Sequence, residues 1–169
     1  MLTIKVNDRQ VLDALNQLAA RTKNLRPALM EIGEDLVEST KRRFATATAP
    51  DGSPWAANSQ VTVERYLGIF KNSYKKDGSL SKAGQARSTG KKPLTGESKD
   101  LAKTINYQVR GATGVSIGSP VVYAAMHQFG GTKGQFPHLW GNIPARPFLG
   151  VSTEDKANIL DIIGTYLVK

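Results

Sequence analysis

The chain has 169 residues, a length that suits one domain, since single domains hold about 100–200 residues. Hydrophobic residues make up 40% of it, which allows a packed core, and the absence of cysteine excludes disulfides, thiol nucleophiles, iron–sulfur clusters and cysteine zinc sites. Its formal net charge of +9 and sequence pI of about 9.9 favour an acidic partner or a nucleic acid.

The N-terminal third is predicted to be mostly helical. Alternating apolar residues at 2–6 indicate a short strand, and apolar residues over 11–19 fall on one helical face. From Leu25 to Phe44, apolar side chains recur every three or four residues, which predicts an amphipathic helix of about five turns. Two prolines and a glycine between positions 49 and 54 end this helix, and Trp55 follows at once.

The middle of the chain carries most of the excess charge. The pattern at 59–74 is ambiguous, and a short amphipathic helix is one interpretation of it. Residues 71–92, which we call the basic segment, contain seven cations against one acid, Asp77, and so contribute +6 of the +9. With three glycines and four serines, the segment is predicted to be a flexible basic loop inserted in the domain. The seven cations are Lys71, Lys75, Lys76, Lys82, Arg87, Lys91 and Lys92.

The remaining elements are short until the C-terminal helix. One or two helical turns are predicted at 97–103, a β-hairpin at 105–117 around a glycine-bounded turn, and a helical turn at 121–129. Glycines make 130–141 a loop, and two prolines make 143–149 extended. Ser152 and Asp155 have capping-box spacing and precede a broad apolar face up to Leu167, which predicts a C-terminal helix.

These elements predict the fold class. Because helices and strands are segregated along the chain, the class is α+β. We expect long N-terminal amphipathic helices packed on a small antiparallel sheet, with a C-terminal helix and a flexible basic loop. All of this is predicted to form a single domain over 1–169, with the basic insertion at about 71–92.

No pattern predicts catalytic chemistry. The chain has two histidines, His127 and His138, eleven positions apart, with no acid between Asp100 and Glu154, so a metal site is not expected. Serine-elbow and phosphate-loop motifs are absent from the sequence. We therefore expect no enzyme activity, no metal, no cofactor and no small-molecule substrate. The sequence also shows no signal core and no stretch of about 18 apolar residues, so no membrane contact is expected.

Two features leave alternatives open. The basic segment is either a solvated loop or a contact for an acidic partner or nucleic acid, since lysines bind phosphates by charge. Tyr74 is its only aromatic residue, so a base-stacking platform is not indicated. Arg146 lies between Pro144 and Pro147 on a stiff backbone, where its planar fork suits a carboxylate or carbonyl partner. It either ties a loop to the core or contributes to an interface.

Two motif blocks resemble a known family. The first, at 123–131, reads YAAMHQFGG, and the second, at 143–150, reads IPARPFLG. Together with the DGSPW run at 51–55 after a long helix and the LTG turn at 94–96, they resemble the phage virion morphogenesis family. This family comprises tail-completion proteins of contractile-tailed, Mu-like bacteriophages and related prophages. The resemblance extends in order from about Leu2 to Lys169.

The resemblance implies a non-enzymatic structural protein of the virion. Such a protein completes the tail at the head–tail junction as a homo-oligomeric ring, expected to be a hexamer that matches the tail tube. Its partners are then tail-tube and head–tail connector proteins, with non-specific DNA contact by the basic segment. It is located in the tail or neck of a virion assembled in the bacterial cytoplasm. The residues implied in shaping the subunit or its ring interface are Tyr123, His127, Phe129, Gly130, Arg146, Pro147 and Phe148.

Two other functions remain as alternatives. A nucleic-acid-binding module is supported by the charge alone. A hydrolase that uses His127 is the weakest of the three, because no partner for the histidine is visible in the sequence.

Overall fold

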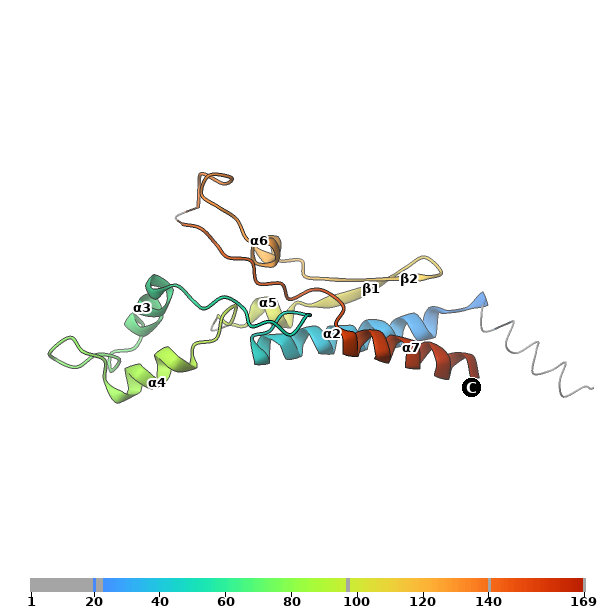
Figure 1. Cartoon of the computed structure of the whole chain (residues 1–169), viewed down its shortest axis with the longest axis horizontal. Helices are drawn as coiled ribbons and strands as arrows, with labels where there is room; N and C mark the ends of the chain where they lie inside the picture. The colour runs from blue at the N-terminus through green and yellow to red at the C-terminus, as the bar shows by residue number, and fades with distance from the viewer. Residues whose placement is uncertain (1–19, 21–22, 97, 140, 169) are drawn as a thin grey trace, which may run out of the picture. The chain divides into compact units, whose positions relative to one another are not determined.

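The computed structural model of the chain describes residues 20, 23–96, 98–139 and 141–168. Its elements in order are α2 (Arg26–Thr46), α3 (Gln60–Gly68), α4 (Lys82–Gly90), α5 (Asp100–Lys103), β1 (Asn106–Arg110), β2 (Gly114–Gly118), α6 (Ala124–Phe129) and α7 (Thr153–Val168) (Figure 1). Helices with a small antiparallel sheet confirm the α+β class. The strand predicted at 2–6 and the helix predicted at 11–19 lie outside the described residues.

The chain divides into two compact units. The first unit consists of residues 1–38, 106–118 and 151–169, and the second unit of residues 39–105 and 119–150. Helix α2 contributes to both, because the division falls after Glu38. The single domain expected over 1–169 stays a prediction.

In the first unit, α2 packs against the β-hairpin. Strands β1 and β2 pair antiparallel, from Asn106 opposite Gly118 to Arg110 opposite Gly114, which confirms the predicted hairpin. A Cβ atom at Gly33 of α2 would lie 2.3 Å from the Tyr107 ring of β1, so only glycine lets the ring lie this close. The apolar face of α2 is buried here, as its spacing predicted, through Ala28, Leu29, Ile32 and Leu36.

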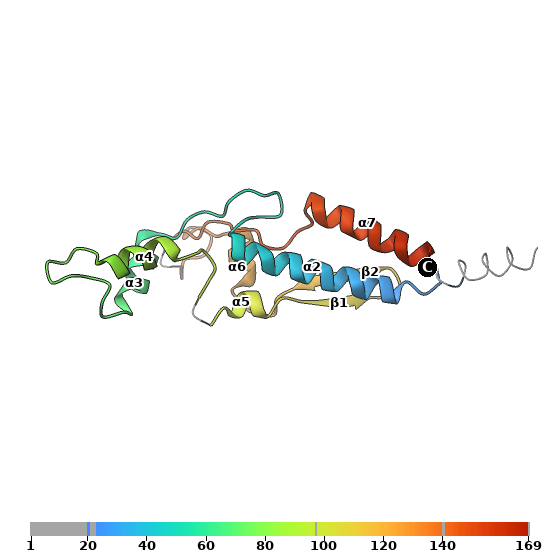
Figure 2. The ribbon, with the colours of Figure 1, turned by 90° about the horizontal axis from the view of Figure 1, so that it is seen from below.

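Helix α7 begins with the capping box that the sequence predicted. The backbone N–H of Ser152 donates to Asp155 Oδ2 at 2.7 Å, and the backbone N–H of Asp155 donates to Ser152 Oγ at 3.1 Å. These reciprocal bonds satisfy two donors that a helix start otherwise leaves open. Asn158 Nδ2 then donates to Asp35 Oδ2 at 3.4 Å, and the Tyr166 hydroxyl donates to the Asn24 carbonyl. The two bonds place α7 antiparallel beside α2 (Figure 2).

The second unit has an aromatic core where α2 ends. The Phe44 ring lies 5.3 Å from the Trp55 ring, edge to face, and 5.5 Å from the Phe148 ring. Trp55 Nε1 donates to the Pro147 carbonyl at 2.8 Å. Nη1 of the buried Arg43 donates to the carbonyls of Phe148 and Gly150, both at 2.9 Å. The second motif block is thereby fixed to the last turn of α2, although they are about a hundred residues apart in the chain.

The prediction that the basic segment is a flexible loop is wrong for much of its length. Residues 82–90 form α4, whose start is capped by Ser81 Oγ accepting from the Gly84 N–H at 3.0 Å. Before it, the chain folds into a closed turn, in which Lys75 N donates to Ser79 O at 2.8 Å. Serines and glycines suggested flexibility, but here they cap a helix and allow close contacts. Helices α3 and α4 pack on each other in Figure 1, where both are green.

Candidate functional site

The two motif blocks lie against each other in the second unit. The Arg146 N–H donates to the His127 carbonyl at 2.8 Å, and Gly131 and Ile143 exchange two backbone bonds of 2.9 and 2.8 Å. Gln128 holds the blocks together from α6. Its Oε1 accepts from the N–H groups of Phe148 and Leu149, both at 3.0 Å, and its Nε2 donates to the Leu149 carbonyl at 3.0 Å.

The bonds of Gln128 were not predicted from the sequence. Gln128 stands inside the first motif block, but nothing in its spacing distinguishes a side chain that bridges two blocks from a surface amide. The glycine after α6 has a clearer role. Gly130 has a φ of 72°, and a Cβ there would lie 2.7 Å from the Ala145 nitrogen. The close approach of the two blocks therefore requires glycine at this position.

Arg146 ties a loop to the core, which was one of its two predicted roles. Its Nε donates to the Ala56 carbonyl at 2.7 Å and its Nη2 to the Ala57 carbonyl at 2.8 Å. The side chain is 7% exposed. Because a guanidinium has five N–H donors, these bonds leave three for other partners. Burial lowers the pKa of Arg146 below its usual range.

A cavity of about 690 Å³ opens beside Arg146. Its walls come from 57–62, from 91–101, from α6 with Tyr123, and from 141–146. Apolar side chains such as Val61, Leu94 and Ile143 line the cavity together with the polar groups of His127 and Arg146. The arrangement is that of a binding site, in which apolar walls surround a few fixed polar groups.

His127 is the polar group of the cavity that lacks a partner. Its Nδ1 is buried and has no hydrogen-bond partner among the described residues. The ring lies edge to face with Tyr123, with 5.8 Å between ring centroids. Burial, and secondarily the charge of Arg146, lowers the pKa of His127 below its ordinary 6.5. The imidazole is therefore neutral at pH 7, with one nitrogen as donor and the other as acceptor.

The structure divides the predicted motif residues into three groups. Tyr123, His127 and Arg146 line the cavity. Phe129 and Gly130 line a neighbouring hollow with Phe136, and Phe129 is 78% exposed. The remaining two, Pro147 and Phe148, belong to the aromatic core through the contacts with Trp55 and Phe44. An interface role for any of them remains a prediction.

The seven cations of the basic segment fall into two groups, those bound within the protein and those that are exposed. Three are bound within the protein. The Arg87 guanidinium lies 4.4 Å from the Phe70 ring centroid, Lys91 Nζ lies 4.3 Å from that of Tyr66, and Lys92 Nζ donates to the Ala45 carbonyl. The other four are exposed, and their ammonium groups form no hydrogen bond or ion pair with another described residue. These four are Lys71, Lys75, Lys76 and Lys82.

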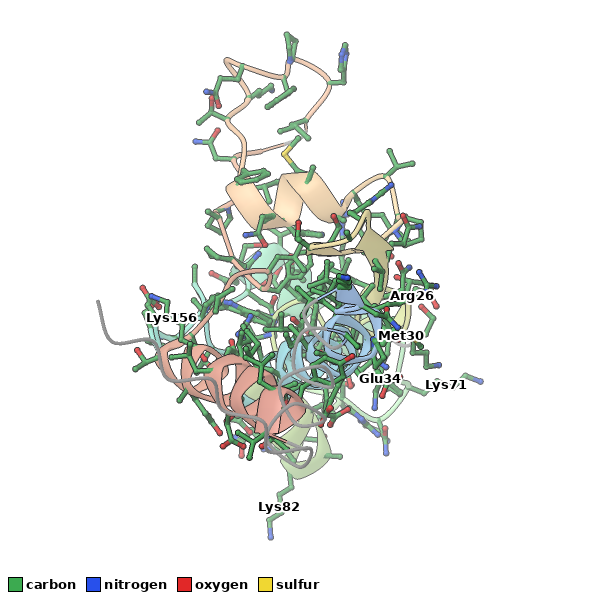
Figure 3. All side chains as sticks on the ribbon, turned by 90° about the vertical axis from the view of Figure 1, so that its right-hand side faces the viewer. Arg26, Met30, Glu34, Lys71, Lys82 and Lys156 are labelled. Carbon is green, nitrogen blue, oxygen red and sulfur yellow. The ribbon has the colours of Figure 1, made fainter. Side chains whose placement is uncertain are left out.

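The exposed lysines do not converge on one point. Figure 3 shows Lys71 and Lys82 extending away from the ribbon in different directions. The excess of positive charge also extends beyond the basic segment, because the second unit as a whole contains fifteen Lys and Arg against five Asp and Glu. The first unit contains eight against nine, so the whole excess of the chain lies in the second unit.

The part of the chain that the structure describes contains neither a metal-holding cluster nor a membrane-spanning helix. Among the described residues, no three His, Cys, Asp or Glu side chains gather to hold a metal ion. None of the described helices is both long and apolar enough to span a bilayer. The described residues offer instead a lined cavity and exposed apolar and basic side chains.

The chain belongs to the phage virion morphogenesis family, whose model matches residues 6–168. It is 30% identical over 163 residues to "Putative capsid assembly protein G" of Escherichia phage Mu, covering 96% of this chain and 91% of that protein. It is also 46% identical over 50 residues to "Mu-like prophage FluMu G protein 2" of Haemophilus influenzae, covering 30% of this chain and 35% of that one. No solved structure gives a significant match. The predicted family is thus confirmed, and with it a role in phage particle assembly.

Proposed function

We propose that the protein is a non-enzymatic structural component that completes the phage tail at the head–tail junction. The observation that carries the proposal is the family match over residues 6–168, nearly the whole chain. Under this proposal the protein acts in the tail or neck of the virion, after assembly in the bacterial cytoplasm. Its partners are the tail tube and the head–tail connector.

The active form is a homo-oligomeric ring under the same proposal, a hexamer if it matches a sixfold tail tube. Rings use head-to-tail interfaces, in which two different surfaces of neighbouring subunits meet. The exposed Phe129 and the hollow that it lines with Phe136 supply an apolar surface of the kind that subunit interfaces bury.

Deleting the gene from its phage tests the site of action. We expect DNA-filled heads and separate, unjoined tails in electron micrographs of the lysate, because only the last joining step is lost. Adding the wild-type protein to the lysate should restore joined particles. Aberrant or missing heads beside normal tails would contradict the proposal and favour a role in capsid assembly, the role that the name of the Mu relative states.

Contact with DNA is a second candidate function, supported by the four exposed lysines of the basic segment. At the head–tail junction, a polyanion passes close to the protein. Lysines that neutralise phosphates release counterions, so DNA binding by them weakens steeply as salt rises.

Replacing Lys71, Lys75, Lys76 and Lys82 by serine tests this contact. We expect the slope of log affinity for duplex DNA against log salt to become shallower by about 3.6, since each of the four phosphate contacts contributes about 0.9. A control variant removes four exposed lysines that lie outside the basic segment and so has the same net charge. In it, serine replaces Lys23, Lys103, Lys133 and Lys156. Equal losses in the two variants would mean that general charge, and not the basic segment, binds DNA.

A further inference from the structure

Arg146 is a buried cation whose side chain donates only to neutral groups among the described residues. Its bonds to the carbonyls of Ala56 and Ala57 leave its charge without a counter-ion among the described residues. The described acid that lines the cavity, Asp100, accepts a 2.6 Å bond from the Ser98 hydroxyl. A desolvated charge without an opposite charge is costly, so the cavity favours an anion beside Arg146.

His127 adds a second polar group that lacks a partner in the same cavity. Its buried Nδ1 lacks a hydrogen-bond partner, and Arg146 lies near enough for its charge to act on the imidazole. A carboxylate accepts several hydrogen bonds at once, so one group can satisfy both an Nη1–H of Arg146 and an Nδ1–H of His127.

We propose that this cavity binds a carboxylate-bearing peptide segment of a partner virion protein. The carboxylate lies against Arg146 and His127, and the apolar neighbours of the acidic residue lie against Val61, Leu94 and Ile143. The inference rests on the proposed function only in assigning the partner to the virion.

The size and lining of the cavity favour a peptide over nucleic acid. A volume of about 690 Å³ falls in the range of about 300–1,000 Å³ that sites for small ligands occupy, and holds a few side chains. Arg146 is only 7% exposed, so a carboxylate on a flexible side chain reaches it more readily than the phosphates of a nucleic-acid backbone. Lys91 and Lys92 also line the site, but their ammonium groups already donate to the carbonyls of Thr95 and Ala45.

The first test follows the imidazole itself. The probe is a short synthetic peptide of alternating leucine and glutamate, compared with the same peptide carrying glutamine. In an NMR pH titration, we expect the glutamate peptide to raise the pKa of His127, because an adjacent carboxylate favours the protonated ring. The exposed His138, the other histidine of the chain, is an internal reference whose ring signals should be the same with and without the peptide. Equal binding of both peptides, or no binding of either, would overturn the proposal.

The second test blocks the apolar wall. Val61→Glu places a negative charge in the cavity, and we expect it to weaken binding of the glutamate peptide at least about tenfold. Ile69→Glu is the matched control, because Ile69 caps the C-terminal end of the same helix, is 61% exposed and does not line the cavity. Its affinity should equal that of the wild type. Equal weakening by both variants would overturn the proposal.

The third test concerns a carboxylate from the chain itself. Glu97, which follows the cavity-lining Gly96, lies outside the described residues. If Glu97→Gln lowers the pKa of His127 in the free protein, the chain's own acid occupies the site, and the proposal is wrong. We expect no such change and unaltered peptide affinity. Peptide binding and particle morphology are separate measurements. If the peptide does not bind, the gene-deletion test of tail completion still stands.

Discussion

Replacing Phe148 by alanine is expected to lower the free energy of unfolding by about 3–5 kcal/mol, the usual range for a fully buried phenylalanine. Phe148 is 0% exposed and packs on Phe44 with 5.5 Å between ring centroids. Its carbonyl accepts from Arg43 and its N–H donates to Gln128, so both neighbouring elements fix the backbone around the ring. Because the site cannot easily collapse, the change leaves a cavity where α2 meets the second motif block.

Chemical denaturation followed by tryptophan fluorescence measures this loss, since Trp55 belongs to the same cluster. Phe129→Ala is the matched control: it makes the same substitution in the other motif block, at a side chain that is 78% exposed. The control should change stability by no more than about 0.5 kcal/mol. Similar losses in the two variants would contradict the placement of Phe148 in the core and of Phe129 on the surface.

Elements set by neighbouring residues were predicted well from the sequence. The apolar spacing between Leu25 and Phe44 predicted α2, and Ser152 with Asp155 predicted the start of α7. The hairpin followed from strand alternation around Gly111 and Gly114. In each case the residues that determine the element lie within a few positions of one another, so a local pattern carries the information.

The candidate site was predicted less completely, because its geometry depends on distant parts of the chain. The motif blocks marked Tyr123, His127 and Arg146, but no pattern indicated that Arg146 binds the carbonyls of Ala56 and Ala57, about ninety residues earlier. Nor did a pattern separate the cavity-lining residues of the blocks from those in the aromatic core. Such roles depend on which segments meet, and composition and spacing do not contain that information.

The basic segment also shows what the sequence alone does not reveal, because here a predicted loop is folded in the structure. Its composition predicted a loop, since glycine and serine are common in flexible segments. Gly84, however, is buried within α4, and the turn before it returns the chain so that Ser81 N donates to Ser73 O at 2.9 Å. The fold of this segment depends on the contact between Ser73 and Ser81, which the amino-acid composition does not reveal.

Gly84→Val tests whether the basic segment is folded as described. A Cβ at Gly84 would lie 2.0 Å from the carbonyl oxygen of Ser73, a backbone atom that cannot rotate away as a side chain does. We expect α4 to lose its packing on this turn, with a local cost of about 1–3 kcal/mol or more. Hydrogen exchange measures the loss, because each 1.4 kcal/mol corresponds to about tenfold faster exchange of amides over 71–92.

Gly90→Ala is the matched control for that variant. Gly90 ends the same helix, and a Cβ there would meet no atom within 4 Å. Alanine at this position should therefore leave exchange unchanged or slow it, since alanine stabilises a helix relative to glycine by about 0.5–1 kcal/mol. A flexible loop would respond to neither substitution, because a chain without fixed contacts has none to lose. Rapid exchange over 71–92 in the wild type and both variants would thus restore the prediction made from composition. If exchange is fast in the Gly84→Val variant but slow in the wild type and in Gly90→Ala, then Ser73 and α4 are in contact.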